Sequence, residues 1–345
     1  MKQLASTAPG KLVLCGEYAV LDGAPAIVSA VDRRAIVQLR AAESWSVCCP
    51  GFRDGSLSFD LDEANGKTVL RWPGGASPVP LLDSVFREIS PPLANTLDSA
   101  LAITLDTTAF RSQGRKLGLG SSAALTVALT AALAAWTMPA KSAIGEVVGA
   151  KSHAAHRHLQ DGAGSGLDVA TSLGGHLLRY LTDGTAPRRM GWPEGLHAAV
   201  FWSGIVAKTT AKLARLASGE PHASRPALGG SAAAAAAAWE RGTAAAVLEA
   251  TSAWVDALAA FSDAYSLDVF AAGHDRLVAL ARNEGLVYKP CGAGGGDIGV
   301  LLGADPEPIE RFASRAEAAG FQRLPLRLSD TATGIEGLSV EWMQD

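Results

Sequence analysis

The sequence predicts an α+β protein with two lobes. The chain has 345 residues and is 48% hydrophobic, which is enough for one large core or for two or three domains. Strand-like runs of β-branched and aliphatic residues occupy both ends of the chain. Between them, residues from about 208 to 285 are rich in alanine, which favours helices. We expect an N-terminal lobe of residues 1–190 and a C-terminal lobe of residues 191–345, with the boundary inside 185–225.

In the N-terminal half, the period of the apolar residues separates strands from helices. The predicted strands are residues 11–16, 33–42, three short pieces between 45 and 73, 100–110 and one near 175–181. The predicted helices are residues 79–89, about 122–136, 143–159 and one that begins at 167. A loop rich in glycine and serine therefore lies between a strand and a helix.

In the C-terminal half, the pattern runs from strand to helix and back to strand. The most loop-like segment, residues 182–195, precedes a strand near 196–203. The alanine-rich region has a face that can be buried, formed by Trp239, Leu248, Trp254, Leu258 and Phe261. Further strands are predicted at 285–292, 297–302 and 324–329, with a helix at 307–320.

The charge and the cysteines limit the class of protein. The net charge is −4 and the pI about 6.0, so no overall field would attract nucleic acid. No C-x-x-C pair occurs, so neither a zinc site nor a disulfide framework is indicated. The cysteines are Cys15, Cys48, Cys49 and Cys291. We expect them to be buried or inert thiols in a reducing cytoplasm.

No membrane or export segment is expected. Lys11 and Glu17 interrupt the apolar residues near the N-terminus, which argues against a signal peptide. The most apolar predicted helix, Ala123 to Trp136, has 14 residues, fewer than the roughly 20 that span a bilayer. The sequence therefore predicts a cytoplasmic protein without a membrane partner.

Three glycine-rich loops stand out along the chain. They are "APGKLVLCGEYAVLDGAPA" (8–26), "KLGLGSSAAL" (116–125) and "YKPCGAGGGDIGVLL" (288–302). Glycine lets the backbone adopt positive φ and approach a ligand closely. One glycine loop is common in proteins, so the order and number of the three carry more information than any one of them.

The second loop has two readings that the sequence leaves open. Gly118 and Gly120 precede a helix whose first N–H groups and positive dipole end suit a phosphate. The hydroxyl groups of Ser121 and Ser122 could bind phosphate oxygens or Mg²⁺. The loop is not a P-loop, because no lysine follows the last glycine. Alternatively, the glycines only make a tight turn and Ser121 caps the helix.

A fourth segment, "GAGSGLDVATSLGG" (162–175), contains a candidate for the chemistry. Asp168 is expected in the first turn of a helix, where a carboxylate is favoured by the dipole alone. It could also accept a proton from a substrate hydroxyl, with a lysine nearby that keeps it ionised. Lys11 is the natural candidate for that lysine.

Taken together, the three loops resemble the three motifs of the GHMP kinase superfamily, in order and in spacing, over essentially the whole chain. The resemblance implies an N-terminal lobe similar to the second domain of ribosomal protein S5 and a ferredoxin-like C-terminal lobe. It also implies transfer of a phosphoryl group from ATP in the presence of Mg²⁺ to a small molecule. No nucleic-acid or membrane partner is expected, and the sequence leaves the oligomeric state open, with a homodimer as one candidate.

Within the superfamily, four details are similar to the phosphomevalonate kinase family. They are "GEYAVL" with Glu17 and Tyr18, Lys116 before the second loop, "AHRHLQDGAGSGLDVATSLGG" (155–175) and "KPCGAGGGD" in the third loop. The resemblance therefore implies that 5-phosphomevalonate is converted to 5-diphosphomevalonate on the mevalonate route to isoprenoids. Mevalonate or another small-molecule hydroxyl is the alternative acceptor. A non-catalytic sensor of ATP and a metabolite is the second alternative.

The resemblance also implies site residues. Lys11 and Asp168 would be catalytic. The ATP-binding residues would be Lys116, Gly118, Leu119, Gly120, Ser121 and Ser122, and Ser122 would also bind the metal. The substrate-binding residues would be Glu17, Tyr18, Ser165, Lys208, Gly292, Ala293, Gly294, Gly295 and Asp297.

Two positions depart from the family pattern. Cys291 stands where the third motif usually has serine, which removes a good hydrogen-bond donor. "WSGIVAKTT" (202–210) has Val206 and Lys208 where the family tends to have proline and a small hydroxyl residue. Both departures lie in the expected substrate region, so they affect the identity of the acceptor more than the reaction type. The adenine pocket is expected in residues 45–115, where Trp45 or Trp72 could stack on a base or pack in the core.

Overall fold

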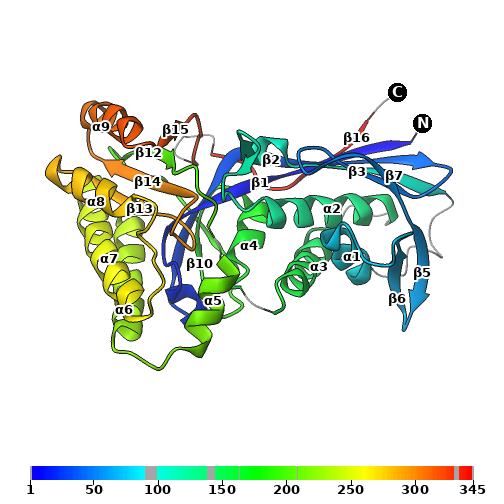
Figure 1. Cartoon of the computed structure of the whole chain (residues 1–345), viewed down its shortest axis with the longest axis horizontal. Helices are drawn as coiled ribbons and strands as arrows, with labels where there is room; N and C mark the ends of the chain where they lie inside the picture. The colour runs from blue at the N-terminus through cyan, green and yellow to red at the C-terminus, as the bar shows by residue number, and fades with distance from the viewer. Residues whose placement is uncertain are drawn as a thin grey trace.

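The computed structural model describes residues 2–89, 99–137, 144–162, 164–207, 209–329 and 334–343. Their elements form two lobes, each built on its own sheet, and the two ends of the chain lie close together on the first lobe (Figure 1). The α+β class is confirmed.

The first sheet has the order β11-β10-β2-β7-β3-β4, with β1 beside β2 and β16 beside β1. Its strands are β1 (Gln3–Cys15), β2 (Ala26–Ala42), β3 (Ser46–Cys49), β4 (Arg53–Ser58), β7 (Ala100–Asp106), β10 (Leu177–Tyr180), β11 (Arg188–Met190) and β16 (Ser339–Met343). Two hairpins lie outside it: β5 (Asp60–Ala64) with β6 (Lys67–Arg71), and β8 (Arg111–Ser112) with β9 (Arg115–Lys116). Along β7, buried and half-buried side chains alternate, as expected for a strand with one face on the core.

Four helices cover one face of the first sheet (Figure 1). They are α1 (Pro80–Glu88), α2 (Ser121–Thr137), α3 (Ile144–Leu159) and α4 (Leu167–Gly174). Helix α2 is apolar on nearly all sides and almost entirely buried, because it packs between the sheet and the other helices. Its first residue follows the second glycine loop directly, so the core fixes the direction in which the helix N-terminus points.

The second sheet has the order β13-β14-β12-β15 with antiparallel pairs. Its strands are β12 (His197–Trp202), β13 (Val287–Pro290), β14 (Ile298–Gly303) and β15 (Gln322–Leu324). The helices of this lobe are α5 (Thr209–Ser218), α6 (Ser224–Arg241), α7 (Ala244–Ala264), α8 (His274–Asn283) and α9 (Pro306–Ala318). Strands and helices β12-α8-β13 and β14-α9-β15 form the two halves of a ferredoxin-like unit. Helices α8 and α9 share one core with the sheet, while α6 and α7 contribute to the other.

Helix α7 is long and apolar enough, by length and composition, to cross a membrane, with a mean hydropathy of 1.3. The sequence analysis did not single it out. One such helix is weak evidence for a membrane span, because a helix buried in a protein core passes the same test of length and composition. Trp254 and Leu258 of α7 are fully buried within the lobe, which accounts for its apolar character.

Two segments differ from the sequence-based expectation. The strand predicted at 324–329 is wrong: β15 ends at Leu324, because Pro325 has no N–H for a ladder hydrogen bond. The chain then crosses to the first sheet, where Leu328 pairs with Val31. Strand β16, which the analysis did not predict, also joins the first sheet through β1. The division at residue 190 stays a prediction.

A buried ion pair joins the two lobes. Lys289 in β13 is fully buried, and its ammonium group pairs with the carboxylate of Glu17, which follows β1 and is 4% exposed. Lys289 Nζ also donates to the Val13 carbonyl oxygen at 3.2 Å and contacts Cys291 Sγ at 3.7 Å. Removal of either partner would leave the other charge buried and unpaired, which is strongly destabilising because a buried charge carries a large desolvation penalty.

We expect Lys289→Met to lower the free energy of unfolding by about 3–5 kcal/mol, because Glu17 would keep a buried charge without a partner. The double variant Glu17→Gln/Lys289→Met removes both charges and should recover most of that loss. Chemical denaturation of the three proteins measures both effects. A double variant that is no more stable than Lys289→Met would contradict the coupling.

An aromatic cluster holds α1 against β5 and β6. Phe86 is fully buried, and its ring centroid lies 5.8 Å from that of Trp45 and 6.1 Å from that of Phe59. Phe59 in turn lies 5.1 Å from Trp72, whose indole N–H donates to Asp83 at 3.0 Å. Of the two readings of Trp45 and Trp72, this arrangement favours packing in the core.

Phe86→Ala should therefore cost about 3–5 kcal/mol of stability, through lost burial and the cavity left behind. Phe52, which is 60% exposed, provides the matched control: Phe52→Ala should change stability by no more than about 0.5 kcal/mol. Equilibrium unfolding in urea compares the two. Equal effects from both substitutions would argue against the cluster as part of the core.

Candidate active site

A cavity of about 730 Å³ lies where the three glycine loops meet. Its lining includes most of the site residues that the sequence analysis selected. These are Lys11, Glu17, Tyr18, Lys116, Gly118, Leu119, Gly120, Ser121, Ser122, Ser165, Asp168, Gly292, Ala293 and Asp297. Segments as far apart in the sequence as Lys11 and Asp297 therefore form a single site. Lys208 lies outside the described residues.

The second loop is held tightly against the first and the third. Gly118 and Gly120 have φ of 79° and 78°, which favours glycine at both positions. A Cβ on Gly118 would lie 2.6 Å from the Asp297 side chain, and one on Gly120 would lie 3.1 Å from Lys11 Cγ. The Leu119 carbonyl oxygen accepts a hydrogen bond from the Lys11 N–H at 2.9 Å. Gly118 therefore has no room for a Cβ unless Asp297 moves, and a Cβ at Gly120 would require the Lys11 side chain to shift.

Helix α2 begins directly behind this loop, at Ser121. Ser121 is the first residue of the helix, so it does not occupy the capping position before it. Ser121 and Ser122 are half-buried and line the cavity. The first N–H groups of a helix have no partner within the helix, and together with the positive dipole end they suit an anion. Lys116 adds an exposed positive charge on the same wall.

Asp168 occupies the first turn of α4, as predicted, and lines the cavity. Its Oδ1 accepts a hydrogen bond from the Val169 N–H at 3.0 Å and lies 3.9 Å from His156 Nδ1. Within the described residues no ion pair joins Asp168 to Lys11. Lys11 instead extends toward the third loop, where its Nζ lies 4.0 Å from the position of a Cβ on Gly292. Both residues line the same cavity.

His156 also belongs to the site, although it was not among the residues predicted from the sequence. It is 3% exposed, lines the cavity, and its Nε2 has no hydrogen-bond partner among the described residues. Its position in the segment 155–175, which is similar to a signature of the family, is the feature of the sequence that could have identified it. Ser165, on the loop before α4, lines the cavity beside it, and its carbonyl oxygen accepts a hydrogen bond from the Tyr180 hydroxyl at 2.6 Å.

The first loop contributes Glu17 and Tyr18. One carboxylate oxygen of Glu17 is paired with Lys289, while Oε2 is buried without a partner among the described residues. That oxygen can accept a hydrogen bond from a bound molecule. Tyr18 has φ of 61°, and its hydroxyl donates to the Ala293 carbonyl oxygen at 2.7 Å. Burial raises the pKa of Tyr18, followed by the charge of Glu17, so the hydroxyl keeps its proton.

The third loop divides into two parts. Gly292 and Ala293 line the cavity, whereas Gly294 and Gly295 do not. A Cβ on Gly294 would lie 2.5 Å from the Val269 carbonyl oxygen, and one on Gly295 would lie 2.4 Å from Lys212 Nζ. These two glycines therefore pack against the protein behind the loop, which differs from the substrate contact expected for them.

Two ionisable groups of the third loop line the cavity, the half-buried Asp297 and the buried Cys291. Burial raises the pKa of the Asp297 carboxyl, and the Ala207 N–H at 3.2 Å and the neighbouring lysines Lys11, Lys116 and Lys212 oppose the rise. Burial also raises the pKa of the Cys291 thiol to about 11, although Lys289 acts in the opposite direction. Cys291 therefore presents a neutral thiol to the cavity.

Comparison with known proteins agrees with this architecture. No protein-family model matches the sequence. A phosphomevalonate kinase from Streptomyces sp. (strain CL190) is 31% identical, covering 95% of this chain and 97% of its own. Among solved structures, a Lin0012 protein from Listeria innocua has a TM-score of 0.81 at 19% identity, covering 98% of this chain and 99% of its own.

A Streptococcus pneumoniae phosphomevalonate kinase, solved in complex with phosphomevalonate and AMPPNP, has a TM-score of 0.75 at 18% identity. The alignment covers 94% of this chain and 99% of that one. At this identity the structural match supports the fold, while the full-length match to the Streptomyces kinase identifies the family. The chain belongs to the phosphomevalonate kinase family of the GHMP kinase superfamily.

Proposed function

We propose that the protein transfers the terminal phosphoryl group of ATP, in the presence of Mg²⁺, to the phosphate of 5-phosphomevalonate, which gives 5-diphosphomevalonate. The observation that carries the proposal is the cavity in which the three glycine loops, the N-terminus of α2 and Lys11 converge. The full-length similarity to a phosphomevalonate kinase supports the choice of acceptor.

The second loop has the features that a triphosphate needs. Gly118 and Gly120 allow close approach of the backbone, and the free N–H groups at the start of α2 can bind phosphate oxygens. Lys116 would neutralise part of the charge. Phosphoryl transfer depends mostly on positioning and on neutralisation of charge, so this combination fits the reaction.

The residues present also fit a magnesium ion. In the described part of the chain no three His, Cys, Asp or Glu residues form a metal-binding group. Mg²⁺ keeps several waters and is commonly bound through substrate phosphates and one or two protein ligands, so a large set of protein ligands is not needed. Ser122, which lines the cavity at the start of α2, would provide a hydroxyl ligand. The ion would neutralise charge on the phosphates.

Lys11 and Asp168 would act on the reacting groups. The ammonium group of Lys11, beside Gly120 and Gly292, would stabilise the negative charge on the transferred phosphoryl group. A phosphate acceptor is already ionised near neutral pH, because its second pKa is about 6. Asp168 would therefore orient the acceptor in this reaction more than it would remove a proton.

One observation favours the alternative acceptor class. A hydroxyl acceptor has to lose a proton, and Asp168 with His156 3.9 Å away offers a carboxylate in the cavity for that task. Mevalonate or another small-molecule hydroxyl is therefore the second candidate. Val206, which lines the cavity, and Lys208 replace residues typical of the family near this region, so the acceptor has to be tested directly.

Purified protein with ATP and Mg²⁺ should convert 5-phosphomevalonate to its diphosphate, with much lower turnover of mevalonate and of galactose. A coupled assay for ADP, with the product identified by mass spectrometry, measures this. Turnover of mevalonate but not of phosphomevalonate would establish the alternative. No turnover of any acceptor together with tight ATP binding would favour a non-catalytic sensor.

Asp168→Ala should lower kcat by a factor of roughly 10², as expected when the acceptor loses a group that orients it, while ATP still binds. Asp168→Asn keeps the shape and should separate the effect of the charge from that of the side-chain volume. Steady-state kinetics and titration of a fluorescent ATP analogue provide the two readouts. Near-normal rates in Asp168→Ala would refute the assigned role.

The assembly and location of the protein stay predictions. A cytoplasmic location and the absence of nucleic-acid and membrane partners are predicted from the sequence, and a homodimer is the candidate assembly to test. Sedimentation of the purified protein would measure its oligomeric state.

A further inference from the structure

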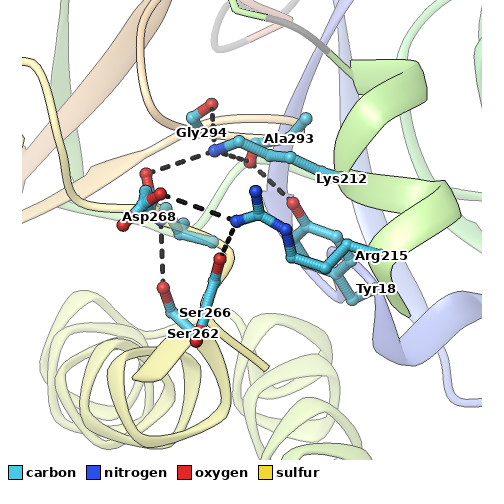
Figure 2. Close-up of polar contacts among 9 residues, drawn as sticks. Tyr18, Lys212, Arg215, Ser262, Ser266, Asp268, Ala293 and Gly294 are labelled. Atoms are coloured by element: carbon cyan, nitrogen blue, oxygen red, sulfur yellow. Dashed lines mark hydrogen bonds and ion pairs between the residues drawn. The ribbon is translucent and has the colours of Figure 1, made fainter. Parts of the chain in front are cut away.

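Lys212, on helix α5, lies behind the third glycine loop and outside the cavity. Figure 2 shows its ammonium group directed at backbone carbonyl groups from two separate segments. Its Nζ donates to the carbonyl oxygens of Gly294 at 2.8 Å, Ala293 at 3.2 Å and Asp268 at 3.2 Å. An ammonium group has three N–H donors, and here three acceptors surround it. The residues on either side, Ala211 and Leu213, line the cavity, but Lys212 does not.

The backbone at Gly295 is adapted to this ammonium group. Gly295 has φ of 72°, and a Cβ there would lie 2.4 Å from Lys212 Nζ and 2.7 Å from the Asp268 carbonyl oxygen. The Gly295 N–H donates to the Val269 carbonyl oxygen at 2.7 Å. The run of glycines in the third loop therefore serves, in its second half, to let the lysine reach the backbone.

The Ala293 carbonyl group links Lys212 to the first glycine loop. The Ala293 carbonyl oxygen accepts from Lys212 on one side and from the Tyr18 hydroxyl at 2.7 Å on the other, as Figure 2 shows. Ala293 and Tyr18 both line the cavity. Because a trans peptide is planar, fixing this oxygen also fixes the direction of the Gly294 N–H on the other side of the bond.

We propose that Lys212 is a positioning residue of the active site. Its ammonium group holds the carbonyl groups of Ala293 and Gly294 behind the loop, and thereby sets where Gly292 and Ala293 meet the phosphoryl acceptor. The role of the loop toward an acceptor rests on the proposed function, whereas the positioning of the loop does not.

Charge supports this assignment. Within the described residues Lys212 forms no ion pair, so backbone carbonyl groups are its direct partners. Burial lowers the pKa of Lys212, while the carboxylates of Asp268 and Asp297 act in the opposite direction. A positive group that draws carbonyl oxygens away from the cavity also removes their negative ends from the neighbourhood of an anionic acceptor.

Arg215, one turn later on α5, offers a matched control. Its guanidinium group donates to the Ser266 carbonyl oxygen and lies 3.7 Å from an oxygen of Asp268 (Figure 2). It ties the helix to the segment before α8, as Lys212 does, but it does not contact the third loop. A role limited to docking of α5 would therefore be lost in Arg215→Met as much as in Lys212→Met.

The experiment combines amide hydrogen exchange with kinetics. In Lys212→Met, peptides covering residues 291–296 should exchange faster than in the wild type, and in Arg215→Met they should not. Lys212→Met should raise the KM for phosphomevalonate and lower kcat/KM by a factor of roughly 10–100, as expected for a displaced binding group. The KM for ATP should change little, and Arg215→Met should leave both KM values within about threefold.

Lys212→Arg separates charge from position. It keeps the positive charge, but a planar guanidinium group cannot direct its donors as an ammonium group does. We expect partial recovery of the acceptor KM and of the slow exchange together. Full recovery of KM while the loop still exchanges fast would show that charge alone acts, and would overturn the proposal. Unchanged exchange in Lys212→Met, or equal effects in Arg215→Met, would also overturn it.

The proposed function can fail separately. If the wild type does not phosphorylate phosphomevalonate, the acceptor assignment is wrong, while the exchange data still decide the role of Lys212. If the wild type is active and the two methionine variants behave alike, only the inference about Lys212 fails. Circular dichroism of each variant checks that it is folded. If Lys212→Met does not fold, Lys212→Arg still tests the proposal through the exchange of the loop and the acceptor KM.

Discussion

The ion pair between Lys289 and Glu17 is the contact on which the site depends. It joins β13 of the second sheet to the end of β1 in the first, with both side chains almost completely buried. A pair of this kind tolerates little displacement, because either charge alone would be buried without compensation. The two lobes are thereby held at a fixed distance directly beside Cys291 and the third glycine loop. Phosphoryl transfer requires such fixed geometry between donor and acceptor.

The three glycine loops fit together because each lacks side chains where the next one approaches. Gly118 leaves room for Asp297, Gly120 for Lys11, and Gly295 for Lys212. Charged groups therefore reach the backbone of neighbouring loops at distances that a Cβ would prevent. This explains why the glycines of the third loop differ in their contacts: Gly292 faces the cavity, and Gly295 accommodates a lysine behind it.

The balance of charge in the cavity bears on the acceptor. Lys11 and Lys116 line it, and Lys212 lies just behind it, whereas the carboxylates on its wall belong to Glu17, Asp168 and Asp297. Glu17 is already paired with Lys289, and burial raises the pKa of Asp297. The pairing of Glu17 with Lys289 reduces the negative charge that faces a second phosphate, which suits an anionic acceptor. Asp168 is the exception, and its carboxylate is the feature that a hydroxyl acceptor would use.

The sequence by itself determined the fold class and the three loops, because glycine spacing, helix starts and apolar periods are local properties. The resemblance to the GHMP kinase superfamily then gave most of the residues that line the cavity. The sequence did not determine that Lys11 forms no ion pair with Asp168 in the described part of the chain, that His156 enters the site, or that Gly294 and Gly295 lie outside the cavity lining. Nor did it reveal the partners of Lys289 and Lys212, or the return of β16 to the first sheet. These depend on contacts between residues up to hundreds of positions apart, which only the tertiary structure decides.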